Sequence, residues 1–206
     1  MIGMDKLTAK VLSTMNEMLS VDNRCPEFDE LDKIAQHLGA NLCSGATQWA
    51  FVFPCYKVVF KFPKWDETDD DYCELELRNY NLGKKYGIER CLLPIEKVGE
   101  TDSGIPVYVQ PMYTTSHEDL PYGVRKRWER KLHGLHQAEI IRKIENGCHY
   151  CPTRLWVERA TQIYGKAFMR SFQKWSKEGR VNDLHSSNIG YLRKQPIIID
   201  YAGYHG

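Results

Sequence analysis

Apolar residues recur every three to four positions over several long stretches of the chain, and this spacing predicts amphipathic α-helices. Gly39 follows the second stretch, where we expect a left-handed C-terminal cap. The third stretch should bury Leu75, Leu77, Tyr80 and Leu82. The predicted helices cover residues 1–20, 26–38, 71–86, 124–147 and 155–179, and Pro26 lies in the first turn of the second helix.

The pattern changes to that of β-strands between the second and third helices and again after the third. Residues 49–62 are aromatic and β-branched with a turn at Pro54, which predicts two strands. Further strands are expected over 92–98 and 105–110, joined as a hairpin, and over 196–200. This order of elements indicates an α+β fold.

The chain therefore divides into three predicted parts. Residues 1–38 form N-terminal helices, 39–113 form a small β-rich unit that contains one helix, and 114–206 form a mainly helical unit with a short β tail. A length of 206 residues fits one well-buried domain or two small ones.

Composition narrows the functional classes. The 28 Lys and Arg residues nearly balance the 27 Asp and Glu residues, so no global basic field favours nucleic acid. No stretch approaches the ~20 apolar residues of a membrane span, and the start lacks a signal-peptide core. The seven cysteines are an odd, scattered set, which suits reduced thiols. We expect a cytoplasmic protein, in a bacterial or host cytosol, with no membrane or nucleic-acid partner.

Three oxygen-bearing side chains near the end of the sequence could carry chemistry. Asp183 is followed five residues later by Asn188, and Asp200 ends an isoleucine-rich run. Phosphoryl transfer needs a carboxylate near the attacking hydroxyl and hard oxygen ligands that hold Mg²⁺ against the phosphates. Taken alone, the same residues could equally cap a turn and end a strand.

These residues resemble the catalytic loop and metal-binding Asp of the protein kinase-like superfamily. The run Val58-Val59-Phe60-Lys61 is similar to that family's Val-Ala-x-Lys strand, whose Lys contacts the nucleotide phosphates. A lysine among apolar strand residues needs an anion or a place at the sheet edge. Glu76 on the following helix is the expected partner, and Glu74 is the alternative.

The remaining family elements occur in the same order along the chain. Gly45 occupies the place of the glycine-rich loop, although the other two glycines are absent, and Ala50 would lie above the adenine ring. Backbone groups around Met112 would bind adenine as the hinge. His185 stands where protein kinases usually have a phosphate-contacting Lys. The resemblance implies Asp183 as the base, with Asn188 and Asp200 as metal ligands.

The resemblance implies a kinase-like α+β fold in which a small antiparallel N-lobe with one helix precedes a reduced, mainly helical C-lobe. That C-lobe would end just after the metal-binding Asp200, without an activation segment, as in small kinase-like proteins of bacteria and phages. The implied function is ATP- and Mg²⁺-dependent phosphotransfer. We expect the acceptor to be a protein hydroxyl. The alternatives are a pseudokinase that binds a partner, and a small-molecule kinase similar to aminoglycoside phosphotransferases, which His185 favours.

A zinc site is a separate possibility. Cys148 and Cys151 form one Cys-x-x-Cys pair, and His133 and His136 share a face of a predicted helix. Free thiols in a connection between helices are the alternative interpretation.

Overall fold

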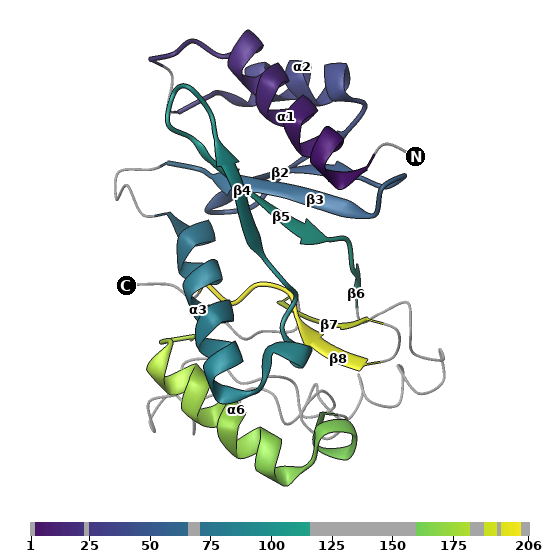
Figure 1. Ribbon diagram of the computed structural model, residues 1–206, viewed down its shortest axis with the longest axis vertical. Helices are drawn as coiled ribbons and strands as arrows, with labels where there is room; N and C mark the ends of the chain where they lie inside the picture. Colours follow the sequence, from purple (N-terminus) through teal and green to yellow (C-terminus); the bar gives the residue numbers. More distant parts are fainter. Residues whose placement is uncertain are drawn as a thin grey trace, which may run out of the picture. The chain divides into compact units, whose positions relative to one another are not determined.

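The computed structural model describes residues 3–22, 25–65, 71–115, 160–181, 188–192 and 195–202 (Figure 1). The chain forms two compact units. The first comprises Met1–Leu77 and Ile95–Met112, and the second comprises Arg78–Pro94 and Tyr113–Gly206. The protein is of the α+β class.

The first unit is built on a five-stranded antiparallel sheet with the order β1-β2-β3-β5-β4. Its strands are β1 (Asn41–Ser44), β2 (Gln48–Phe53), β3 (Val58–Pro63), β4 (Glu96–Glu100) and β5 (Pro106–Pro111). The two strands predicted in 49–62 are present, and the turn between them places Lys57 at a positive φ of 54°. Because β3 lies in the middle, its residues are flanked by a strand on each side.

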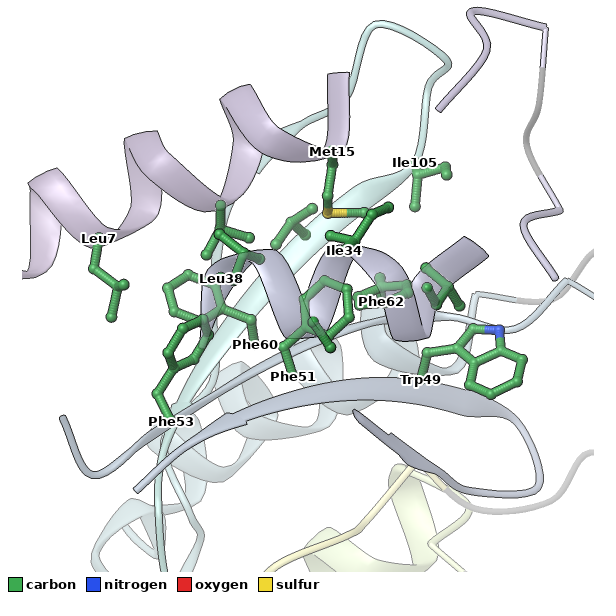
Figure 2. Packing of buried hydrophobic residues seen from close by; sticks show 14 of the residues in the cluster. Leu7, Met15, Ile34, Leu38, Trp49, Phe51, Phe53, Phe60, Phe62 and Ile105 are labelled. Atoms are coloured by element: carbon green, nitrogen blue, oxygen red, sulfur yellow. The ribbon is translucent and has the colours of Figure 1, made fainter. Parts of the chain in front are cut away.

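Helices α1 (Met4–Met18) and α2 (Phe28–Leu38) cover one face of this sheet (Figure 2). Their buried apolar side chains pack against Phe51, Phe60 and Phe62 in a single cluster. Gly39 adopts the left-handed conformation expected of it, with a φ of 69°, and its N–H closes the last turn of α2. Both predicted N-terminal helices are thus confirmed.

Strand alternation gives the sheet two chemically different faces. Trp49, Phe51 and Phe53 of β2 and Phe60 and Phe62 of β3 belong to the apolar cluster beneath α1 and α2. Because side chains alternate along a strand, the intervening residues lie on the opposite face. That face, here called the polar face, carries Ala50, Lys61, Tyr108 and Gln110.

Helix α3 (Tyr72–Tyr86) buries a different stripe from the one its leucines predict. Its fully buried positions include Cys73, Glu76 and Asn79. Gly83 is also buried, and a Cβ on it would come within 2.3 Å of the Leu92 side chain. The predicted positions are only half-buried; they are Leu75, Leu77, Tyr80 and Leu82. The buried stripe is polar because Glu76 and Asn79 find partners inside the protein.

The second unit contains a three-stranded antiparallel sheet, order β6-β7-β8. Its elements are η1 (Glu89–Cys91), β6 (Thr114–Thr115), α6 (Lys166–Glu178), β7 (Ile189–Leu192) and β8 (Gln195–Ile198). Trp175 of α6 and Tyr201 are fully buried in its main apolar cluster. Tyr201 comes three residues after the end of β8, so the end of the described chain lies within this core.

Two predicted elements are wrong in detail. The strand expected over 92–98 begins only at Glu96, because Leu92 and Leu93 instead pair with Ile198. The helix expected over 155–179 is interrupted at Gly165, whose φ of 86° and ψ of 164° are not helical. The helix predicted over 124–147 lies outside the described residues.

Within the described ranges, no helix is both long enough and apolar enough to span a membrane. Cys43, Cys55 and Cys91 are free thiols, and Cys91 is fully buried. Burial raises the pKa of the Cys91 thiol above its ordinary value, so this side chain acts as an apolar core residue rather than a nucleophile.

Candidate functional site

A buried ion pair occupies the polar face of the first unit. The Lys61 ammonium donates to Oε2 of Glu76 at 2.8 Å. The Glu76 side chain has no exposed surface and that of Lys61 is 12% exposed. The ion pair between Lys61 and Glu76 that the sequence predicts is therefore present.

A second donor binds the other carboxylate oxygen of Glu76. Nε2 of Gln110, on β5, donates to Oε1 of Glu76 at 2.7 Å, and Gln110 is 1% exposed. Each carboxylate oxygen thus has its own buried N–H donor, one charged and one neutral. Buried carboxylates need such partners, because removing an unpaired charge from water costs several kcal/mol, on the order of 5 or more.

Glu74, the alternative partner for Lys61, has a different role. The hydroxyl of Tyr108 lies 2.8 Å from Oδ2 of Asp71 and 3.0 Å from Oε2 of Glu74. The backbone N–H of Glu74 donates to Oδ1 of Asp71 at 3.0 Å, so Asp71 also caps the start of α3. Burial, then the hydrogen bond and charge of Asp71, then those of Glu74, raise the pKa of Tyr108. Tyr108 therefore stays neutral well above its ordinary pKa.

The strand register places three further residues in one row with Lys61. Ala50 on β2 is its partner on one side, and Tyr108 on β5 is its partner on the other. Cys43 on β1 pairs with Ala50. This row crosses four strands of the sheet, and Ala50 leaves room next to Lys61 because its side chain is a single methyl group.

The turn that carries Gly45 is short and closed. It joins β1 to β2 through residues 45–47, and the N–H of Gly45 donates to the carbonyl oxygen of Gln48 at 2.8 Å. A Cβ on Gly45 would meet that oxygen at 3.4 Å, which is ordinary contact, and Gly45 is not among the glycines with positive φ. Glycine is therefore not required here by the backbone.

Met112 follows β5 directly. Its N–H donates to the carbonyl oxygen of Lys57 at 2.7 Å, and its residue is 38% exposed. One of the backbone groups around Met112 that the resemblance assigns to adenine, the N–H of Met112, thus already has a backbone partner. A ligand at this position would have to use another backbone group.

Asn188 and Asp200 lie at the same end of the β7–β8 hairpin. Asn188 precedes β7, Asp200 comes two residues after β8, and the N–H of Ile199 donates to the carbonyl oxygen of Asn188 at 3.0 Å. Both side chains are half-buried. One carboxylate oxygen of Asp200 accepts a long hydrogen bond, 3.4 Å, from the N–H of Ala202.

The backbone after Asp200 is fixed by buried polar contacts within the second unit. Nδ2 of Asn79 donates to the carbonyl oxygen of Tyr201 at 2.9 Å. The indole N–H of Trp175 donates in turn to the carbonyl oxygen of Asn79 at 2.8 Å. The Tyr201 hydroxyl donates to the carbonyl oxygen of Leu93. These contacts hold the segment that carries Asp200.

Several predicted residues cannot be placed. Asp183 and His185 lie outside the described residues, as do the four candidate zinc ligands Cys148, Cys151, His133 and His136. Among the residues that the structure does describe, no three His, Cys, Asp or Glu side chains form a group that could hold a metal.

Sequence reasoning missed Gln110 and Asn79. Both carried a readable signal. Gln110 is a polar residue two positions after Tyr108 on an alternating strand, so the two side chains share a face. Asn79 follows Glu76 by three residues on a helix, so these two also share a face. A buried amide needs partners, so each marks a contact with another element.

Comparisons with protein-family models, with curated proteins and with solved structures find no match to this chain. Fold and function therefore have to be argued from the geometry of the residues described above.

Proposed function

We propose that this chain has a protein kinase-like fold and is an ATP- and Mg²⁺-dependent phosphotransferase that acts on a protein hydroxyl. Lys61 would orient the nucleotide phosphates, and Asn188 and Asp200 would bind the metal ion. Asp183 would position the acceptor hydroxyl. The observation that carries the proposal is the buried Lys61–Glu76 ion pair.

This ion pair favours a ligand role because of its position. Lys61 lies on the middle strand of the sheet, where an apolar side chain would pack without desolvating a charge. Buried ion pairs are weak contributors to net stability, so stability alone gives little reason for a lysine at this position. An ammonium has three N–H donors, so it can bind a carboxylate and a phosphate at the same time.

Sheet topology supports the same interpretation. Protein kinases carry their phosphate-binding Lys on the third strand and its Glu partner on the helix that follows. In this chain Lys61 is on β3, Glu76 is on α3, and α3 lies between β3 and β4 in the sequence. The order of elements in the first unit therefore supports the proposed kinase-like fold.

The residues near the β7–β8 hairpin fit Mg²⁺. This cation prefers oxygen ligands and usually takes one or two from the protein, with water and phosphate oxygens supplying the rest. Asn188 and Asp200 offer an amide and a carboxylate oxygen at one end of a hairpin. When bound, Mg²⁺ would offset charge on the phosphates; the chain's own part is to hold these two side chains at one end of the β7–β8 pair.

A thermal-shift measurement tests the nucleotide site. ATP with Mg²⁺ at ~100 times its dissociation constant should stabilise the chain by about 2.7 kcal/mol. For a chain of this size that corresponds to a rise in Tm of roughly 5–11 °C. Asp200→Ala should lose the Mg²⁺-dependent part of the shift. Asp102→Ala, which removes an exposed carboxylate from the β4–β5 turn, should keep it.

Phosphate transfer tests the reaction itself. The wild-type chain should transfer the γ-phosphate of ATP to a protein acceptor, and Asp183→Ala should abolish the transfer without removing the thermal shift. No shift with ATP and Mg²⁺, or an equal shift in Asp200→Ala, would contradict the proposed metal-dependent nucleotide site.

A second candidate function is a pseudokinase that binds a partner and does not transfer phosphate. The closed turn at Gly45 favours it, because that turn uses the Gly45 N–H internally and leaves a loop of three residues. The Met112 N–H is likewise occupied by Lys57. ATP binding without transfer to protein or small-molecule acceptors would support this candidate over the enzyme.

A further inference from the structure

Gln110 is the least expected member of the buried group on the polar face. It is almost fully buried, and its side-chain amide faces a carboxylate rather than solvent. An ionised carboxylate accepts hydrogen bonds and donates none, so the amide must present its NH₂ group to Glu76. Gln110 therefore acts as a neutral donor beside the charged donor Lys61.

The strand register places these two donors on either side of one acceptor. Lys61 pairs with Tyr108, and Val59 pairs with Gln110, so Gln110 is the diagonal neighbour of Lys61 on the same face. Glu76 bridges them, with Oε2 on Lys61 and Oε1 on Gln110. Three elements, β3, α3 and β5, thus meet at a single carboxylate.

Removing the amide would change the position of the Lys61 ammonium. Oε1 of Glu76 would be left buried without this donor, and a buried acceptor in that state is costly. Rotation of the carboxylate would bring Oε1 toward Lys61, which already donates to Oε2. Lys61 would then be drawn toward Glu76 and away from a nucleotide phosphate bound at the polar face of the sheet.

We propose that Gln110 is a positioning residue for the nucleotide polyphosphate: its amide fixes the Glu76 carboxylate so that Lys61 can donate to Glu76 and to a phosphate at the same time. This inference rests on the proposed function and deepens it, because it assigns the phosphate chain, not adenosine, as the part of the ligand that depends on Gln110. Gln110 acts only through Glu76 and Lys61.

Binding of ATP and adenosine by the full chain, measured by calorimetry in Mg²⁺, tests this role. Gln110→Met keeps the length of the side chain and removes the donor. It should weaken ATP binding about tenfold, the effect of losing one hydrogen bond to a charged group, and change adenosine binding less than twofold. Gln36→Met is the matched control, because Gln36 also donates to a carboxylate, that of Asp32, but on the exposed side of α2.

A double-mutant comparison separates positioning from mere structural support. In a Lys61→Met background, Gln110→Met should change ATP affinity less than twofold, because its effect passes through Lys61. The inference is overturned if Gln110→Met leaves ATP affinity unchanged, or if it weakens adenosine binding as much as ATP binding. It is also overturned if the fold-losses in ATP affinity caused by Gln110→Met and Lys61→Met multiply in the double variant. A wild-type chain that does not bind ATP removes this inference and the proposed nucleotide site together, whereas an effect missing only in Gln110→Met removes this inference alone.

Gln110→Glu tests the same role without loss of shape. The introduced carboxyl can donate to Glu76 only while it is protonated. Among the described residues, the charged and titratable groups in this hydrogen-bonded region are Lys61 and Glu76, and then Tyr108 with its carboxylate partners Asp71 and Glu74. Relative to wild type at each pH, ATP affinity should be near normal at pH 5 and about tenfold weaker at pH 8. A ratio that does not change with pH would contradict the positioning role.

Discussion

Lys61→Met should destabilise the protein more than Glu76→Gln, although both variants break the same ion pair. The two partners differ in their access to water. Glu76 has no exposed side-chain surface, and Lys61 is 12% exposed. Removing Lys61 leaves a carboxylate that cannot reach solvent, whereas removing the charge of Glu76 leaves an ammonium on a flexible stem that can move toward solvent.

The magnitudes follow from the contacts. Removing one partner of a buried pair costs about 3–5 kcal/mol, because the other charge stays buried. We expect Lys61→Met to lower the free energy of unfolding by about 3 kcal/mol, since Gln110 still donates to one oxygen of Glu76. Glu76→Gln keeps an acceptor for Gln110 and should cost about 1–2 kcal/mol. The double variant should cost less than the two single variants together.

Urea unfolding of each variant, followed by tryptophan fluorescence, measures these differences. Lys97→Met provides the matched control, because Lys97 and Glu100 form an exposed ion pair at 3.1 Å with side chains 41% and 53% exposed. That substitution should change the free energy of unfolding by at most about 0.5 kcal/mol. In thermal unfolding, Lys61→Met should lower the Tm by roughly 6–12 °C.

The reasoning would be refuted by either of two results. Equal losses of unfolding free energy in Lys61→Met and Glu76→Gln would mean that burial of the Glu76 carboxylate does not determine the difference between the two variants. Strict additivity in the double variant would mean that the two side chains do not interact in solution. A loss in Lys97→Met as large as that in Lys61→Met would remove the role of burial altogether.

Two further predictions concern stability. Tyr108 keeps its proton in the folded state above its ordinary pKa, so its contribution is complete below pH ~10 and is lost as pH rises beyond it, at about 1.4 kcal/mol per pH unit. Tyr108→Phe should flatten the decline in unfolding free energy between pH 10 and 11.5 by up to that slope, and an unchanged slope would contradict the assignment. Gly165→Ala should cost about 1–3 kcal/mol, because the φ of 86° and ψ of 164° are essentially restricted to glycine. Gly3→Ala, where φ is −63° and a Cβ would meet nothing within 4 Å, should cost less than about 1 kcal/mol, because alanine is only a poorer N-cap than glycine. Equal urea midpoints for the two variants would be the contrary result.

The features that the sequence predicts well are those in which local pattern and tertiary packing agree. The period of the two N-terminal helices matches the face they bury on the sheet, and Gly39 ends the second of them as expected. The turn between β2 and β3 carries its own signal at Pro54. In each case neighbouring residues along the chain decide the structure.

The features that the sequence does not predict depend on distant partners. Leu92 and Leu93 read as a strand because they are apolar, but their partner is Ile198, more than 100 residues later in the chain. The break at Gly165 falls inside a continuous apolar period, and glycine is tolerated in many helices. An apolar pattern indicates that residues are buried, but it does not identify the element against which they pack.

Buried polar residues carry the information that the apolar pattern lacks. On α3 the leucines indicate one face, while Glu76 and Asn79 are polar side chains that are nevertheless fully buried. Each buried polar atom needs a partner, so a carboxylate, an ammonium and an amide that are all buried in one sheet-and-helix unit constrain one another. Glu76 can satisfy Lys61 and Gln110 only if β3 and β5 are adjacent and present both side chains on the face toward α3, which is the observed register. The charge that made Lys61 a candidate for phosphate binding therefore also specifies how the strands around it pair.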